Sequence, residues 1–159
     1  MHKLFSTIIV AAIFVVPQAA KAGFLIEGSA GTGIQFKPNL GERVPTMIML
    51  APGYGIGEMI RAELGIVGAL GDVENGKFDL QLRPMLVIDP PIIPIYGRLV
   101  VGVFNLLDEE TRTFAYGGAV GVGGSVAGLG LFAELGVFPQ GNAETIIGEI
   151  RAGIMLAFD

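Results

Sequence analysis

The last stretch of the chain, Gly148 to Phe158, alternates between two kinds of position with a period of two. Ile150 and Ile154 fall on one face, whereas Glu149 and Arg151 fall on the other. This period is typical of a β-strand with two unlike faces. A soluble barrel would turn its charged face to water, but this chain is too apolar throughout for that arrangement. We therefore expect the apolar face to meet lipid and the charged face to line a lumen.

Seven earlier segments alternate in the same way, each about as long as a tilted membrane strand of roughly 9–11 residues. Polar loops follow the first, third, fifth and seventh segments, and tighter turns follow the second, fourth and sixth. This order predicts an all-β fold, an eight-stranded antiparallel up-and-down transmembrane β-barrel with both termini in the periplasm. The predicted strands are Phe24–Phe36, Thr46–Ile56, Met59–Leu70, Lys77–Ile88, Ile95–Phe104, Arg112–Gly123, Gly128–Phe138 and Gly148–Phe158. The predicted polar loops are 37–45, 71–76, 105–111 and 139–144.

The charged residues inside these strands, away from the strand ends, all lie opposite the more apolar face. Where one strand carries two of them, they are two or four residues apart and share a face. An Arg at the bilayer midplane costs roughly 2–4 kcal/mol, which a narrow lumen of paired carboxylates and guanidinium groups avoids. Side chains can fill a barrel of eight strands, so we expect a plugged lumen. The predicted lumen network is Glu27, Arg61, Glu63, Asp79, Arg83, Arg98, Glu134, Glu149 and Arg151.

Composition agrees with a surface that faces something other than water. The chain is 52% hydrophobic and 16% charged, with a mean hydropathy of +0.65, whereas a soluble domain carries about 25% charged residues. Its 25 glycines are spread through the apolar segments, which suits close packing in a small barrel. The net charge of −5 argues against a nucleic-acid partner.

The first 22 residues are typical of a secretory signal peptide. His2 and Lys3 form a short positive start, and Leu4–Val16 is an apolar core too short to span a bilayer. Ala20–Ala22 is an A-x-A cleavage site, which places the mature start at Gly23. We therefore expect export through the inner membrane, followed by residence in the outer membrane.

In pattern, the mature chain resembles the small eight-stranded outer-membrane β-barrel proteins of the OmpX and OmpA membrane-domain type. Such proteins usually end on an aromatic residue that the barrel-assembly machinery reads. The resemblance thus implies that Phe158, the penultimate residue, is the assembly signal, and that outer-membrane lipid and this machinery are partners. Aromatic residues near strand ends fit the interfacial girdles of such barrels, namely Phe36, Phe78, Phe104, Phe114, Phe138 and Phe158.

Two features oppose the eight-strand prediction. Pro52 and Pro84 lie inside predicted strands, where proline cannot donate to the ladder, so we expect both at bulges or near strand ends. Gly117–Gly136 contains G-x-x-x-G spacings and stays uncharged until Glu134, which also fits a glycine-zipper membrane helix. The alternation of apolar residues from Leu129 onwards favours the strand.

The predicted mature chain lacks His and Cys, which removes the usual general base, thiol nucleophile and most transition-metal sites. We therefore predict no catalytic residue, no cofactor and no metal site. Glu149 and Arg151 are better interpreted as a structural ion pair, and 108–110 as a solvated loop tip. The leading hypothesis is a non-enzymatic barrel that displays its polar loops, possible sites for a surface ligand. The alternatives are a narrow channel or small-solute transporter, and a periplasmic or membrane-associated binding protein.

Overall fold

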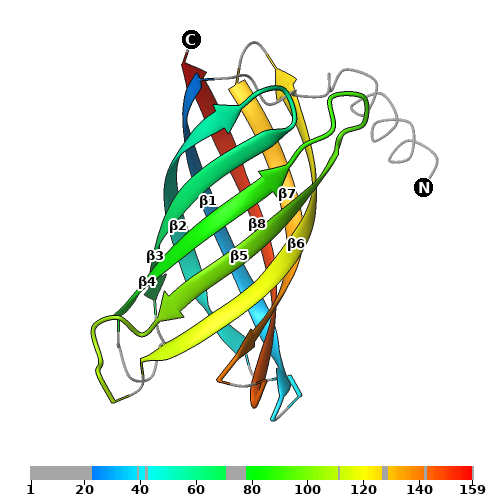
Figure 1. The fold of residues 1–159 in the computed structure, drawn as a ribbon. Coiled ribbons are helices and arrows are strands. Elements are labelled where there is room, and N and C mark those ends of the chain that lie inside the picture. The colour runs from blue at the N-terminus through cyan, green and yellow to red at the C-terminus, as the bar shows by residue number, and fades with distance from the viewer. Residues whose placement is uncertain are drawn as a thin grey trace, which may run out of the picture.

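The computed structural model describes residues 23–38, 40–41, 43–70, 78–110, 112–126, 129–141 and 143–158. Within them, eight antiparallel strands form a closed barrel in which each strand pairs with the next and β8 pairs with β1 (Figure 1). The strands are β1 (Gly23–Lys37), β2 (Arg43–Ile56), β3 (Ile60–Leu70), β4 (Phe78–Ile88), β5 (Ile95–Phe104), β6 (Thr113–Val126), β7 (Leu129–Gln140) and β8 (Thr145–Phe158). The all-β antiparallel barrel predicted from the sequence is confirmed. The predicted signal peptide and loop 71–76 lie outside the described residues.

Several strands are longer than predicted. β2 begins at Arg43 and β7 runs to Gln140, inside stretches that were predicted as loops, and β6 continues to Val126 through a predicted turn. In each case a neighbouring strand supplies the hydrogen-bond partners. The added pairs include Ile34 with Arg43, Val126 with Leu129, and Gln140 with Thr145. The sequence pattern missed these ends because they carry no apolar alternation.

The two strand prolines are not at bulges, so that expectation was wrong. Both lie well inside their strands, in stretches whose register does not shift. Each instead coincides with a gap in one ladder. The β2–β3 pairs pass from Leu50↔Ile66 to Gly53↔Glu63, and the β4–β5 pairs pass from Leu82↔Val103 to Met85↔Val100. The missing proline N–H is thus accommodated by a local break in pairing, without an extra residue.

The glycine-zipper alternative is contradicted, because Gly117–Gly136 is divided between strands β6 and β7 of the barrel. None of the described residues belongs to a helix long and apolar enough to cross a membrane. Several of these glycines provide space for aromatic rings instead. A Cβ at Gly136 would lie 2.7 Å from the Phe138 ring, and one at Gly121 would lie 2.7 Å from Cε1 of Tyr96.

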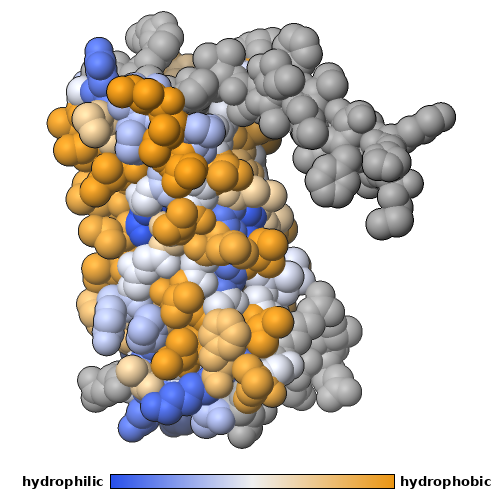
Figure 2. Space-filling view, turned by 90° about the vertical axis from the view of Figure 1, so that its right-hand side faces the viewer, coloured by the Kyte–Doolittle hydropathy of each residue, from blue (hydrophilic) through white to orange (hydrophobic). Residues whose placement is uncertain are grey.

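The wall of the barrel has an apolar outside and a mixed, packed inside. Outward side chains such as Leu135 and Val120 are 65% and 63% exposed, whereas inward Val87 is completely buried. Figure 2 shows hydrophobic side chains spread over the side of the wall that it faces, with pale and some hydrophilic residues visible between them and further hydrophilic residues at both ends. The inside therefore holds the core of this protein.

Candidate functional site

Eight of the nine residues predicted for the lumen network are buried inside the barrel. Side chains alternate between the two faces of a strand, so residues whose numbers are all odd, or all even, share a face. Each of these eight residues shares its odd or even numbering with buried neighbours on the same strand. They come from β1, β3, β4, β5, β7 and β8, so the network joins strands on opposite sides of the lumen. The eight are Glu27, Arg61, Glu63, Arg83, Arg98, Glu134, Glu149 and Arg151, each at most 5% exposed.

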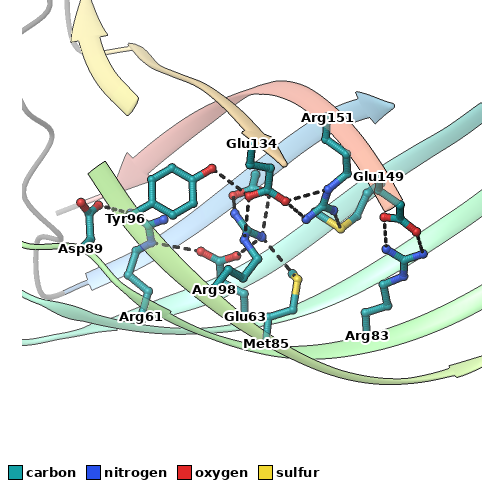
Figure 3. A network of polar contacts seen from close by, with 12 residues as sticks. Arg61, Glu63, Arg83, Met85, Asp89, Tyr96, Arg98, Glu134, Glu149 and Arg151 are labelled. Atoms are coloured by element: carbon teal, nitrogen blue, oxygen red, sulfur yellow. Dashed lines mark hydrogen bonds and ion pairs between the residues drawn. The ribbon is translucent and has the colours of Figure 1, made fainter. Parts of the chain in front are cut away.

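Arg98 is the centre of the larger group of charges (Figure 3). Its guanidinium Nη2 lies 2.6 Å from Oε2 of Glu27, and its Nη1 lies 3.0 Å from Oε2 of Glu63. Its Nε lies 3.1 Å from Oε2 of Glu134. One residue of β5 thereby contacts carboxylates of β1, β3 and β7, and each of the three guanidinium nitrogens faces a different one.

Two further arginines extend this group along the lumen. Arg61 donates from Nε to Glu63, at 3.0 Å, and from Nη1 to Asp89, at 2.6 Å. Arg151 donates to Glu134, which also accepts a hydrogen bond of 2.8 Å from the Tyr96 hydroxyl. Burial raises the pKa of the Asp89 carboxyl, which follows β4, although the nearby Arg61 guanidinium acts in the opposite direction.

A second group surrounds Arg83, nearer the loop end of the barrel. Its Nη1 and Nη2 donate to the two carboxylate oxygens of Glu149, at 2.7 and 2.8 Å. Gln81 accepts from Nη2 at 2.6 Å. The guanidinium carbon lies 4.5 Å from the ring centroid of Phe104 and 5.1 Å from that of Phe138. Two aromatic rings and one bidentate carboxylate thus hold this cation across the lumen.

Asp79 is the one predicted network residue that lies elsewhere. It is only half-buried, and its Oδ2 accepts hydrogen bonds from the Asn105 backbone N–H, at 3.1 Å, and from the Gln81 amide, at 3.3 Å. It therefore anchors the start of the loop after β5. The reason is its place at the second residue of β4, where the lumen opens towards the loops.

Two polar residues of the lumen, Asp89 and Tyr96, were not predicted from the sequence. Asp89 shares the odd-numbered positions of Arg83, and Tyr96 shares the even-numbered positions of Arg98, so extending the alternation would have found both. Phe104 and Phe138, predicted as interfacial aromatics, are 3% and 1% exposed and face inward, so that prediction was wrong. Their even positions on β5 and β7 match inward Arg98 and Glu134, and this parity was the signal.

The remaining predicted girdle residues are at the barrel surface. Phe36, Phe78 and Phe114 are 49%, 52% and 59% exposed, near the loop end. Phe158 is 48% exposed, and its ring centroid lies 5.9 Å from that of Phe24 at the other end. The predicted assembly signal is therefore in the last paired position of β8, opposite the start of β1.

In the part of the chain that the structure describes, the buried network of the lumen holds four guanidinium groups and five carboxylates. The carboxylates are Glu27, Glu63, Asp89, Glu134 and Glu149. A cavity of about 20 Å³ is lined in part by Glu27, Arg61, Asp89 and Tyr96, which is room for about one water molecule. Among the described residues, no cluster of three or more His, Cys, Asp or Glu side chains has the arrangement of a metal site. The chemistry of this lumen is ion pairing between strands.

Comparison with known proteins supports the fold. No family model matches the sequence, and no curated protein matches it. The crystal structure of Neisserial surface protein A (NspA) superposes with a TM-score of 0.58 at 14% sequence identity, covering 86% of this chain and 98% of that one. This likeness concerns the fold, and at that level the resemblance to small eight-stranded outer-membrane barrels is confirmed: the chain is a closed antiparallel barrel of the same kind.

Proposed function

We propose that this protein is a non-enzymatic integral outer-membrane barrel with a structural, surface-display role and a plugged, salt-bridged lumen. The observation that carries the proposal is the inversion of the wall, which has charges inside and apolar side chains outside. Monomeric soluble proteins rarely expose contiguous apolar patches above a few hundred Å². Here the exposed large hydrophobic residues occur on all eight strands, so lipid is the surrounding that fits them.

The packing of Arg83 supports the plugged lumen. Its side chain is almost completely buried, it is paired through both terminal nitrogens, and it lies against two aromatic rings. Opening a path for solute would leave its guanidinium or the Glu149 carboxylate buried without a partner, and breaking a buried pair costs about 3–5 kcal/mol. A closed lumen is therefore the stable arrangement, and a channel is the weaker alternative.

The display role follows from the two ends of the barrel. β1 begins and β8 ends at the end that carries the tight turns. In an outer-membrane barrel the longer loops are extracellular. The two longest connections here, 71–77 between β3 and β4 and 105–112 between β5 and β6, belong to the end opposite the termini, together with 38–42 and 141–144. We propose that these loops face the cell exterior and carry any contact with a surface ligand, and that export by the N-terminal signal peptide and insertion by the barrel-assembly machinery bring the chain there.

The proposal is tested with mature protein refolded in detergent. Samples run unboiled and boiled on a gel should differ in mobility, with a β-type circular dichroism spectrum. The same preparation in planar bilayers should give no ion conductance. Steady single-channel conductance would favour the channel alternative. Solubility of the folded mature protein without detergent would contradict the membrane location.

A further inference from the structure

The larger group of lumen charges contains one carboxylate more than it has guanidinium groups. Among the described residues, its cations are Arg61, Arg98 and Arg151, and its carboxylates are Glu27, Glu63, Asp89 and Glu134. The second group is balanced, because Arg83 and Glu149 pair one to one. With every carboxylate ionised, the larger group would therefore hold one buried negative charge without a counter-ion, which is costly in a packed interior.

Asp89 is the carboxylate that this group holds least firmly. Its Oδ2 accepts one hydrogen bond, from Nη1 of Arg61 at 2.6 Å, and no described residue donates to its Oδ1. Glu27, by contrast, contacts Arg98 through both of its carboxylate oxygens, at 3.1 and 2.6 Å. The other two carboxylates each accept hydrogen bonds from two different residues. Asp89 thus has an oxygen that can take a proton while the hydrogen bond from Arg61 stays in place.

Asp89 is also the carboxylate of this group that is nearest to the medium. It follows β4 at the turn end of the barrel, and it lies at one end of the row of charges in Figure 3, beyond Arg61. Its side chain is 10% exposed, whereas those of Glu27, Glu63 and Glu134 are at most 1% exposed. The cavity of about 20 Å³ beside it has room for about one water molecule. A proton can therefore reach Asp89 without any rearrangement of the strands.

We propose that Asp89 is a proton-binding site, at which the larger group takes up the one proton that balances its charge. The proton comes from water, bonds to Oδ1 and leaves a neutral carboxyl that still accepts from Arg61. The turn keeps its place, because the Asp89 N–H donates to the Met59 carbonyl at 2.8 Å and the Gly123 N–H donates to the Pro94 carbonyl at 2.9 Å. This inference goes beyond the display role and depends only on the folded barrel.

The surroundings of Asp89 agree with proton uptake at this position. The charged or titratable residues around it are Arg61 and Glu63 of β3, Tyr96 of β5 and Glu27 of β1, and the cavity lining from β6, β7 and β8 is uncharged. Glu58, in the turn between β2 and β3, is exposed. Burial and the Glu63 carboxylate raise the pKa of Asp89, and the Arg61 guanidinium offsets only part of this rise.

Proton binding at Asp89 couples folding to pH in an unusual direction. A raised pKa means that the folded barrel binds this proton more tightly than the unfolded chain, in which Asp titrates at about 3.9. Ionised Asp89 therefore lowers the free energy of unfolding near neutral pH. This loss is relieved as the pH falls through the pKa of Asp89 in the folded barrel, so mild acid should stabilise the protein.

The test compares Asp89→Asn with Glu149→Gln, which make the same change from carboxylate to amide in the unbalanced and in the balanced group. In urea titrations of protein folded in detergent, Asp89→Asn should have a higher midpoint than the unaltered protein at about pH 7, and the gap should close at about pH 5. Glu149→Gln should lower the midpoint at both pH values, because Arg83 loses its paired charge. At about pH 5, infrared spectra of the unaltered barrel should contain the C=O band of one carboxylic acid more than those of Asp89→Asn.

A midpoint of Asp89→Asn below that of the unaltered protein at about pH 7 would overturn the proposal, as would a gap that does not change with pH. Equal carboxylic acid bands in the two proteins would also overturn it, because the proton would then reside on another group. If Asp89→Asn alone lacks the heat-dependent mobility shift, the ionised carboxylate is needed for folding and the proposal fails. Absence of that shift in the unaltered protein is a different result, which contradicts the membrane barrel itself.

Discussion

At the scale of single residues, Arg98 has the most demanding environment in the barrel. Three carboxylates from three other strands lie within 3.1 Å of its guanidinium, and its side chain is inaccessible to solvent. A buried pair of this kind adds little beyond what an apolar core of the same volume would, but removing one partner leaves the others uncompensated. The network thus adds little to the free energy of unfolding, but the loss of any one of these four charged side chains should lower that free energy strongly.

Replacing Arg98 by Met should destabilise the folded barrel by about 3–5 kcal/mol, because Glu27, Glu63 and Glu134 would lose their common cation. Arg98→Lys should rescue only part of this loss, since a single ammonium nitrogen would replace three guanidinium nitrogens that each face a different carboxylate. The measurement is the urea concentration at which half of the protein loses its heat-dependent gel shift.

Arg112→Met is the control for Arg98. Arg112 lies 3.9 Å from Glu109 at the exposed loop end, with side chains 43% and 88% exposed, so its replacement should change stability by less than about 1 kcal/mol. Equal urea midpoints for the Arg98 and Arg112 variants would contradict the central position given to Arg98.

The odd or even position of a charged residue along its strand was enough to predict most of the lumen. Glu27 and Arg151 could be placed inside because a charged side chain in an otherwise apolar strand is expected to face the lumen and not the lipid. Phe104 and Phe138 could not be placed by hydropathy, since an aromatic ring suits either the interface or a packed lumen. Which carboxylate meets which guanidinium depends on strand register and tilt, and the sequence pattern contains neither.

At the scale of elements, the inward glycines determine how closely side chains pack across the lumen. Gly153 of β8 faces Phe132 of β7 and Ser29 of β1. A Cβ built there would lie 2.6 Å from Cζ of Phe132 and 2.6 Å from Cβ of Ser29. The Phe132 ring also makes an edge contact with Tyr96, at 6.3 Å between centroids, so a shift at this position would spread into the charge network.

Gly153→Ala should therefore destabilise the barrel by about 1–3 kcal/mol through overpacking. Gly28→Ala, on the adjacent strand but facing outward into open space, should leave stability within about 0.5 kcal/mol of the unaltered protein. Urea midpoints of the two variants measure the difference. A larger loss of stability for Gly28→Ala than for Gly153→Ala would contradict the assignment of Gly153 to the inward face and Gly28 to the outward face.

The alternation that predicted the strands also explains where their ends were misplaced. The middle of each strand crosses the apolar belt and carries a strict period of two, so β5 was predicted with its observed limits. Outside the belt, pairing continues without that period, as between Gln140 and Thr145. The composition of these strand ends is typical of a loop because both of their faces meet polar surroundings. Their backbone nevertheless stays hydrogen-bonded to the neighbouring strand.

At the scale of the whole molecule, closure and alternating connections define two chemically different ends. The loop after β5 exposes Leu107 at 63%, and the turn after β4 exposes Ile92 at 86%. The chain has no Cys, so single Cys substitutions at these positions report on one end each.

A membrane-impermeant maleimide applied to intact cells should label Leu107→Cys and leave Ile92→Cys unlabelled until the outer membrane is permeabilised. This follows from the proposed orientation, with both termini in the periplasm and the longer loops outside. Labelling of Ile92→Cys alone in intact cells would contradict the proposed orientation.

The most direct test of the account is whether the apolar wall lies in lipid. Spin labels on single Cys substitutions of Leu131, Ala133, Leu135 and Val137, outward positions along β7, would be measured in lipid bilayers, with Leu107→Cys as the loop reference. We predict high accessibility to oxygen and low accessibility to a water-soluble nickel chelate along β7, with the contrast greatest in mid-strand. Nickel accessibility along β7 equal to that at Leu107 would contradict the account, because the wall would then face water.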